Sequence, residues 1–183
     1  MGQRVEEITP ELRTLIEEAP LFFVATAPLS AAGHINLSPK GLDTLRVLDS
    51  RRVAYLDLTG SGNETAAHVS ENARLTIMVC AFSGRPQILR LYCRGHVVNK
   101  TSAEWQELAP LFPVIIGSRQ IMVGELDFAL TSCGYAVPQM SFVAERDTLT
   151  RWAQGKGEDG LVEYRRTKNA RSIDGVPAPR TDD

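Results

Sequence analysis

Short runs of apolar and β-branched residues recur along the first 130 positions, and their pattern predicts strands rather than long helices. Ile88, Arg90, Tyr92 and Arg94 alternate with Leu89, Leu91 and Cys93, so one strand face carries polar groups and the other is apolar. No sustained strand–helix–strand alternation occurs, which disfavours a parallel sheet. The pattern therefore predicts a mainly β (α+β) domain, an antiparallel barrel with flanking helices, whose six strands are 21–27, 34–38, 53–58, 74–82, 87–98 and 120–131.

Apolar stripes at helical spacing predict the helices. Thr9 and Ser102 are suitable caps for helices that begin at Pro10 and near Ala103. A further helix is expected over 64–70, Leu45–Asp49 is expected to be a connector with a helical turn, and two helices broken at Gly155–Gly157 are expected within 147–169. The predicted organisation is a barrel domain at 1–145, a helical extension of that domain at 146–174 and a disordered tail at 175–183.

Composition narrows the classes of function. The chain has 183 residues, 43% of them hydrophobic and 23% charged, and a net charge of −2, so a general attraction to nucleic acid or anionic membranes is not expected. No apolar run approaches the roughly 20 residues needed to span a bilayer, and the polar, acidic N-terminus does not resemble a secretory signal. The three cysteines match no zinc spacing, which predicts reduced thiols, a cytoplasmic location and no metal site.

The stretch from Leu58 to His68 follows a predicted strand, contains a glycine-rich turn and leads into a helix. Such an arrangement gathers backbone N–H groups around an anion such as a phosphate, although many turns of this kind merely connect two elements. Ser61 and Glu64 match a capping box, and Asn63 is an alternative cap.

A second candidate lies at Ser38-Pro39-Lys40-Gly41. Proline removes a ladder donor and glycine permits a positive φ, so the strand is predicted to bulge or end here. A lysine at such a break has a fixed base, which favours a role in binding; the alternative is a solvated turn lysine. The turn Thr131–Pro138 also stands out as an irregular, tightly fitted segment. Its thiol, Cys133, is either reactive or a small residue chosen for fit.

Three segments together carry a resemblance to a known family: Asn36–Gly41, Tyr55–Asn72 and Ile88–Gly95. In order and spacing they resemble the FMN-binding split-barrel proteins related to pyridoxamine 5′-phosphate oxidase, over about the first 130 residues. Ser132–Pro138 is similar to a bacterial oxidase-like subgroup.

The resemblance implies a homodimer with two FMN molecules in clefts between the barrels. It places Lys40, with Ser38, Pro39 and Gly41, beside the flavin or its phosphate. It also implies that the turn Thr59–Thr65 lines the phosphate and ribityl chain and that Arg90 lies beside the isoalloxazine. Ser132–Tyr135, from the same subunit or from the partner, would close the cleft. The implied cofactor-binding residues are Ser38, Pro39, Lys40, Gly41, Leu58, Thr59, Gly60, Asn63, Glu64, Thr65, Arg90, Ser132, Cys133, Gly134 and Tyr135.

The sequence also departs from the family. Where the pyridoxamine phosphate oxidases carry an adjacent Arg-Lys pair, this chain has Asn63-Glu64-Thr65, and Glu64 is expected to turn back into the helix cap. No counterpart of their basic C-terminal substrate segment is recognised, which disfavours pyridoxamine phosphate as substrate. The expected function is that of an FMN-dependent oxidoreductase that exchanges hydride with a small molecule. The alternative is a non-catalytic protein that binds or stores a flavin, a deazaflavin (F420) or haem.

Overall fold

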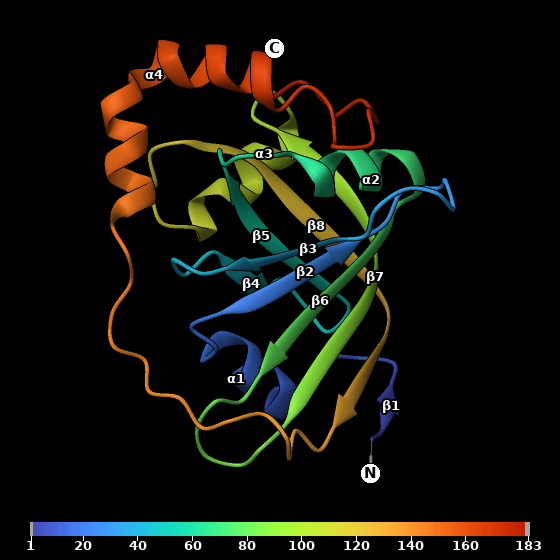
Figure 1. The fold of residues 1–183 in the computed structure, drawn as a ribbon. Helices are drawn as coiled ribbons and strands as arrows, with labels where there is room; N and C mark the ends of the chain where they lie inside the picture. Colours follow the sequence, from blue (N-terminus) through green and yellow to red (C-terminus); the bar gives the residue numbers. More distant parts are fainter. Residues whose placement is uncertain (1, 182–183) are drawn as a thin grey trace.

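The computed structural model describes residues 2–181, which form one curled antiparallel sheet with helices around it (Figure 1). Eight strands are present among these residues rather than the predicted six, because two short ones, the first and the fourth, were not expected. The strands are β1 (Arg4–Val5), β2 (Phe22–Thr26), β3 (Asn36–Lys40), β4 (Leu45–Val47), β5 (Arg52–Leu58), β6 (Arg74–Cys80), β7 (Ile88–Asn99) and β8 (Ser118–Ser132).

The strand order is β3-β2-β6-β7-β8-β5-β4, with β1 also paired to β8. The two ends of this order, β3 and β4, are joined by residues 41–44, so the sheet curls back on itself and forms a barrel with a seam between them. Thr44 holds this seam, since its carbonyl accepts the Leu56 N–H at 2.9 Å and its hydroxyl donates to the Gly41 carbonyl at 2.7 Å. The predicted antiparallel barrel is confirmed.

The segment predicted to be a connector with a helical turn is β4, where Leu45 pairs with Tyr55. Leu45 and Val47 are buried and Arg46 is not, which is the alternation of a strand. Three residues are too few for that alternation to be distinguished from a helical turn in the sequence.

The apolar side chains pack on both faces of β5. One cluster fills the barrel interior around Tyr55 and Val24, and a second lies outside, where Leu56 packs near Phe112 and Trp105. Burial on both faces explains why β5 reads as a continuous apolar run in the sequence.

The helices are α1 (Pro10–Glu17), α2 (Glu64–Asn72), α3 (Ala103–Leu108), the 3₁₀ turn η1 (Ala109–Leu111) and α4 (Thr148–Lys168). Thr9 and Ser102 cap as predicted, accepting the N–H groups of Leu12 and Trp105. The break expected near Gly155–Gly157 occurs at Gly157, whose φ is +66°. None of the helices within residues 2–181 is both long and apolar enough to cross a membrane.

After its bend, α4 passes over the barrel, and the segment that follows it runs beside α2, where the Ile173 N–H donates to Glu64 (Figure 1). The segment predicted to be a disordered tail begins at Gly175, but part of it makes defined contacts: Arg171 forms a β-bridge with Pro177, and the Ala178 N–H donates to the Ala170 carbonyl. Thr181 is 6% exposed. Positions 182 and 183 of this predicted tail lie outside the described residues.

Candidate functional site

A cleft of about 790 Å³ lies between β3, the end of β5, the turn before α2 and the C-terminal end of α4. More than half of the site residues expected from the sequence line it. These are Ser38, Pro39, Lys40, Gly41, Leu58, Gly60, Glu64 and Thr65. The structure thus brings together the two segments that the sequence singled out independently.

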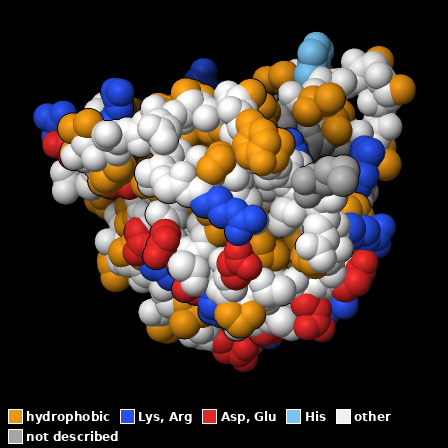
Figure 2. Space-filling model, turned by 90° about the horizontal axis from the view of Figure 1, so that it is seen from below, with side chains coloured by type: hydrophobic (Ala, Val, Ile, Leu, Met, Phe, Trp, Pro, Cys, Tyr) orange, Lys and Arg blue, Asp and Glu red, His pale blue; other side chains and the backbone are white. Residues whose placement is uncertain are grey.

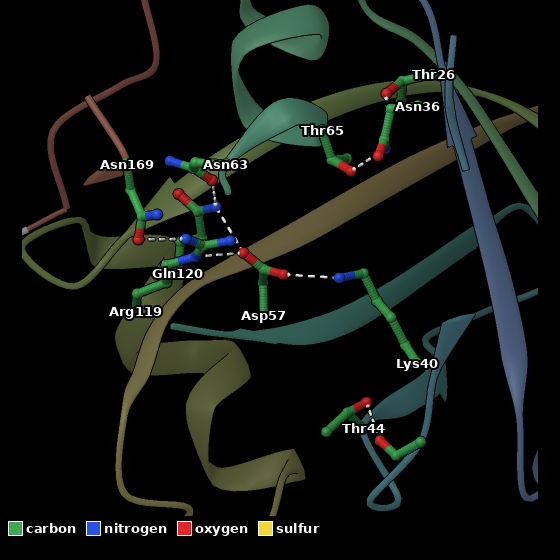
Figure 3. A network of polar contacts seen from close by, with 11 residues as sticks. Thr26, Asn36, Lys40, Thr44, Asp57, Asn63, Thr65, Arg119, Gln120 and Asn169 are labelled. Atoms are coloured by element: carbon green, nitrogen blue, oxygen red, sulfur yellow. Dashed lines mark hydrogen bonds and ion pairs between the residues drawn. The ribbon is translucent and has the colours of Figure 1, made fainter. Parts of the chain in front are cut away.

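Asp57, at the end of β5, is the centre of the cleft floor. One carboxylate oxygen accepts a hydrogen bond from Lys40 Nζ at 3.1 Å, and the other accepts from Arg119 Nε at 2.7 Å and Gln120 Nε2 at 2.8 Å. Figure 3 shows Lys40 and Arg119 pointing toward Asp57 from opposite sides. Burial by itself would raise the pKa of Asp57, but the charges of Arg119 and Lys40 and the hydrogen bonds outweigh burial and hold that pKa well below its usual range.

The network continues from the floor to α4. Gln120 Nε2 also donates to Asn63 Oδ1 at 2.9 Å, and Arg119 Nη1 donates to Asn169 Oδ1 at 2.9 Å (Figure 3). Asn169 in turn donates to the Gly60 carbonyl at 3.1 Å. Buried amides therefore tie the glycine-rich turn to the residue that follows α4.

The strand ends within Ser38–Gly41 as predicted, but at Lys40, two residues after the expected end at Ser38. Strand β3 continues through Lys40, which pairs with Phe22, and Pro39 is tolerated because β3 lies at the edge of the sheet. The chain turns at Leu42 and Asp43, which, rather than Gly41, have positive φ values of 62° and 53°. The Lys40 side chain is 21% exposed and bonds to Asp57, so it is a lysine of the cleft and not a solvated turn lysine.

The turn before α2 also differs from the prediction. Ser61 and Glu64 form no capping box, and Asn63 occupies the cap position without a side-chain cap bond because its oxygen accepts from Gln120. Glu64 instead accepts the Ile173 N–H with both carboxylate oxygens, at 3.2 and 3.1 Å. Thr59 is buried, and its hydroxyl accepts from Arg165 at 3.1 Å. Glu64 therefore holds the segment after α4, not its own helix start.

The remaining predicted residues lie elsewhere in this chain. Arg90 donates to the Ser132 hydroxyl at 3.1 Å, and neither belongs to the described residues that line the cleft. Cys133 and Tyr135 are exposed. Gly134 has a φ of +64°, and a Cβ there would lie 2.9 Å from the Gln87 nitrogen, so this turn requires glycine as expected.

The sequence reasoning missed four residues that line the cleft, Asp57, Arg119, Lys168 and Arg171, and two of the network around its floor, Gln120 and Asn169. For Asp57 a signal was available, since a charge inside a buried apolar strand requires a partner. The basic residues near the end of α4 are numerous in the sequence, but no local pattern indicates that they lie beside the turn before α2.

Comparisons with known proteins show which family the chain belongs to. The sequence model described as pyridoxamine 5′-phosphate oxidase matches residues 8–127. The chain belongs to this family. It is 35% identical to the pyridoxamine 5′-phosphate oxidase family protein ustO of Aspergillus flavus, over 94% of this chain and 76% of that protein.

Solved structures show the same split-barrel fold. HupZ of Group A Streptococcus superposes with a TM-score of 0.53 at 18% identity, over 67% of this chain and 91% of HupZ. A candidate pyridoxamine 5′-phosphate oxidase of Lactobacillus delbrueckii superposes with a TM-score of 0.54 at 16% identity, over 68% of this chain and 94% of that one.

Proposed function

We propose that this protein is an FMN-dependent oxidoreductase that binds FMN in the cleft over Asp57 and exchanges hydride with a small molecule. The observation that carries the proposal is the composition of the cleft in a member of this family. Its volume of about 790 Å³ lies in the usual range for cofactor sites. Four cationic side chains line it against two acids, namely Lys40, Arg119, Lys168 and Arg171 against Asp57 and Glu64.

This charge balance suits a phosphate-bearing ligand. The FMN phosphate is close to doubly charged at pH 7, and its desolvation must be offset by cations and N–H donors. The cleft has an excess of positive charge, and the turn residues Gly60, Ser61 and Gly62 line it. Their N–H groups donate no hydrogen bond to any other residue that the structure describes, so they are available to an anion.

The floor suits the flavin ring. Leu42, Leu56 and Leu58 supply apolar surface, and Lys40 lines the same cleft. A bound FMN supplies the hydride chemistry, and its N1/C2 oxygen region gains negative charge on reduction. Lys40, held in place by Asp57, would stabilise that charge, since an ammonium that donates one hydrogen bond to a carboxylate has two further donors.

We further propose a homodimer in which Arg90 and Ser132–Tyr135 of one subunit approach the cleft of the other. These residues do not line the cleft of their own chain within the described part. The segment after β8 carries exposed apolar side chains, Tyr135, Met140, Phe142 and Val143. Figure 2 shows hydrophobic side chains gathered in patches between charged ones on the lower face. Sedimentation of the purified protein tests this proposal, because a monomer at micromolar concentration would contradict it.

The absorption spectrum of the purified protein, followed by FMN titration and by reduction with NADH or NADPH, tests the cofactor and the activity. We expect a flavin spectrum that bleaches on reduction and returns when a substrate accepts hydride. A protein that is colourless and takes up no FMN would refute the proposal. Flavin binding without turnover would indicate a storage protein, and preference for a deazaflavin would change the cofactor. Haem is disfavoured in this cleft because its described lining contains no histidine, cysteine, methionine or tyrosine, the usual axial ligands.

A further inference from the structure

The C-terminal end of α4 and the residues after it form one wall of the cleft. Lys168 and Arg171 both line the cleft, together with Ser172 and Ile173. Both basic side chains belong to exposed residues, and neither forms an ion pair with another residue in the described range 2–181. We propose that Lys168 and Arg171 bind the phosphate of the cofactor, an assignment that rests on the proposed FMN site.

The wall is held in place by contacts with three other parts of the molecule. Glu64 accepts the Ile173 N–H with both oxygens, and Asn169 donates to the Gly60 carbonyl. Asp174 accepts the His34 backbone N–H and bonds His34 Nδ1, each at 2.7 Å. A segment fixed at three points can present cations to a ligand with little loss of conformational entropy on binding.

The other cations of the cleft are already engaged. Arg119 and Lys40 share the Asp57 carboxylate, and Arg119 also bonds Asn169. The first turn of α2 has an acid, Glu64, and no cation. A phosphate at this turn therefore finds its neutralising charge on the adjoining wall, in Lys168 and Arg171.

The turn and the wall complement each other as a phosphate site. Gly60–Gly62 line the cleft with N–H groups that donate to no other described residue, and the two basic side chains of the adjoining wall line it with positive charge. One Arg171 donor is used for the Gly175 carbonyl, at 2.7 Å, which leaves other guanidinium donors free to contact an anion. This assignment leaves Lys40 for the flavin ring, so the two ends of the cofactor are recognised by different parts of the chain.

Riboflavin has the flavin ring but lacks the phosphate, so comparing it with FMN distinguishes binding of the ring from binding of the phosphate. Affinities for FMN and riboflavin are measured by fluorescence titration for the wild-type protein and for the double variant Lys168→Ala, Arg171→Ala. We expect FMN affinity to fall by roughly ten- to a hundredfold, as for the loss of charge-assisted contacts, with riboflavin affinity unchanged. The loss should shrink at high salt, because the cations are exposed.

Arg166→Ala is the matched control, since Arg166 is an exposed arginine of the same helix that pairs with Glu163 and does not line this cleft. It should leave both affinities unchanged. Equal losses for FMN and riboflavin in the double variant would show that the wall is only structural, and unchanged FMN affinity would remove both residues from the site; either result overturns the inference. A wild-type protein that binds neither flavin would instead refute the proposed function, and the inference with it.

Discussion

Replacing Asp57 by asparagine tests whether the floor of the cleft is held together by charge. The substitution keeps the shape of the side chain but leaves Arg119, which is 5% exposed, without its carboxylate partner. Removing one partner of a buried ion pair costs about 3–5 kcal/mol, because the remaining charge is buried and uncompensated. At about 2–4 °C per kcal/mol for a chain of this size, the melting temperature should fall by roughly 6–20 °C.

The free energy of unfolding is measured by urea denaturation at pH 7 for the wild type and Asp57→Asn. Asp127→Asn is the control, because Asp127 is an exposed acid on β8 and surface changes usually stay within about 0.5 kcal/mol. A loss of less than about 1 kcal/mol for Asp57→Asn, with an unchanged dependence on urea, would refute the view that the buried charges depend on this carboxylate.

The difference in unfolding free energy between wild type and Asp57→Asn should also depend on pH. The pKa of Asp57 is lowered in the folded state, so its contribution to stability is present above the unfolded-state value of about 4 and declines as pH falls toward the lower folded value. The difference between wild type and Asp57→Asn should therefore be constant from about pH 8 to pH 5 and shrink below about pH 4. A difference that grows on acidification would have the wrong sign.

Other substitutions test the cleft and its surroundings. Lys40→Ala should weaken FMN and riboflavin binding alike, by roughly ten- to a hundredfold, since one charge-assisted contact to the ring is lost; unchanged affinities would remove Lys40 from the site. Cys133→Ser should leave FMN affinity almost intact, and a large loss would indicate a direct role for the thiol. Asp174 raises the pKa of His34 by hydrogen bonding and by its charge, so Asp174→Asn should lower the His34 pKa measured by NMR; a pKa that does not move would show that the contact is not formed in solution.

Much of the fold follows from the local sequence pattern. The long strands β6, β7 and β8 were predicted because their runs rich in apolar and β-branched residues are long enough to be recognised, and β7 also alternates with a period of two. β4 was missed because it has three residues, and β1 because it has two. Helix starts at Thr9 and Ser102 were predictable because a cap involves neighbouring residues alone.

The site was harder to predict, because its contacts join residues that are distant in sequence. Lys40 was found, but its partner Asp57 was not, since the pairing depends on how β3 curls toward β5. Glu64 is a second example. The local sequence predicted that its carboxylate caps its own helix, but the carboxylate instead accepts the N–H of Ile173, which is 109 residues away. Caps depend on local spacing, whereas such contacts depend on tertiary packing.

The position of β8 in the sheet has a consequence for the order of folding. β8 joins β5 and β4 to the rest of the sheet, and Asp57 reaches Arg119 across 62 residues of chain through that pairing. Long-range pairing of this kind is slow, because the entropy of closing a large loop is lost before the contacts form. A chain that has formed the β2–β3 and β6–β7 hairpins still lacks the cleft floor. Flavin capture during refolding would thus report the late docking of β5 on β8, at a time when most backbone structure already exists.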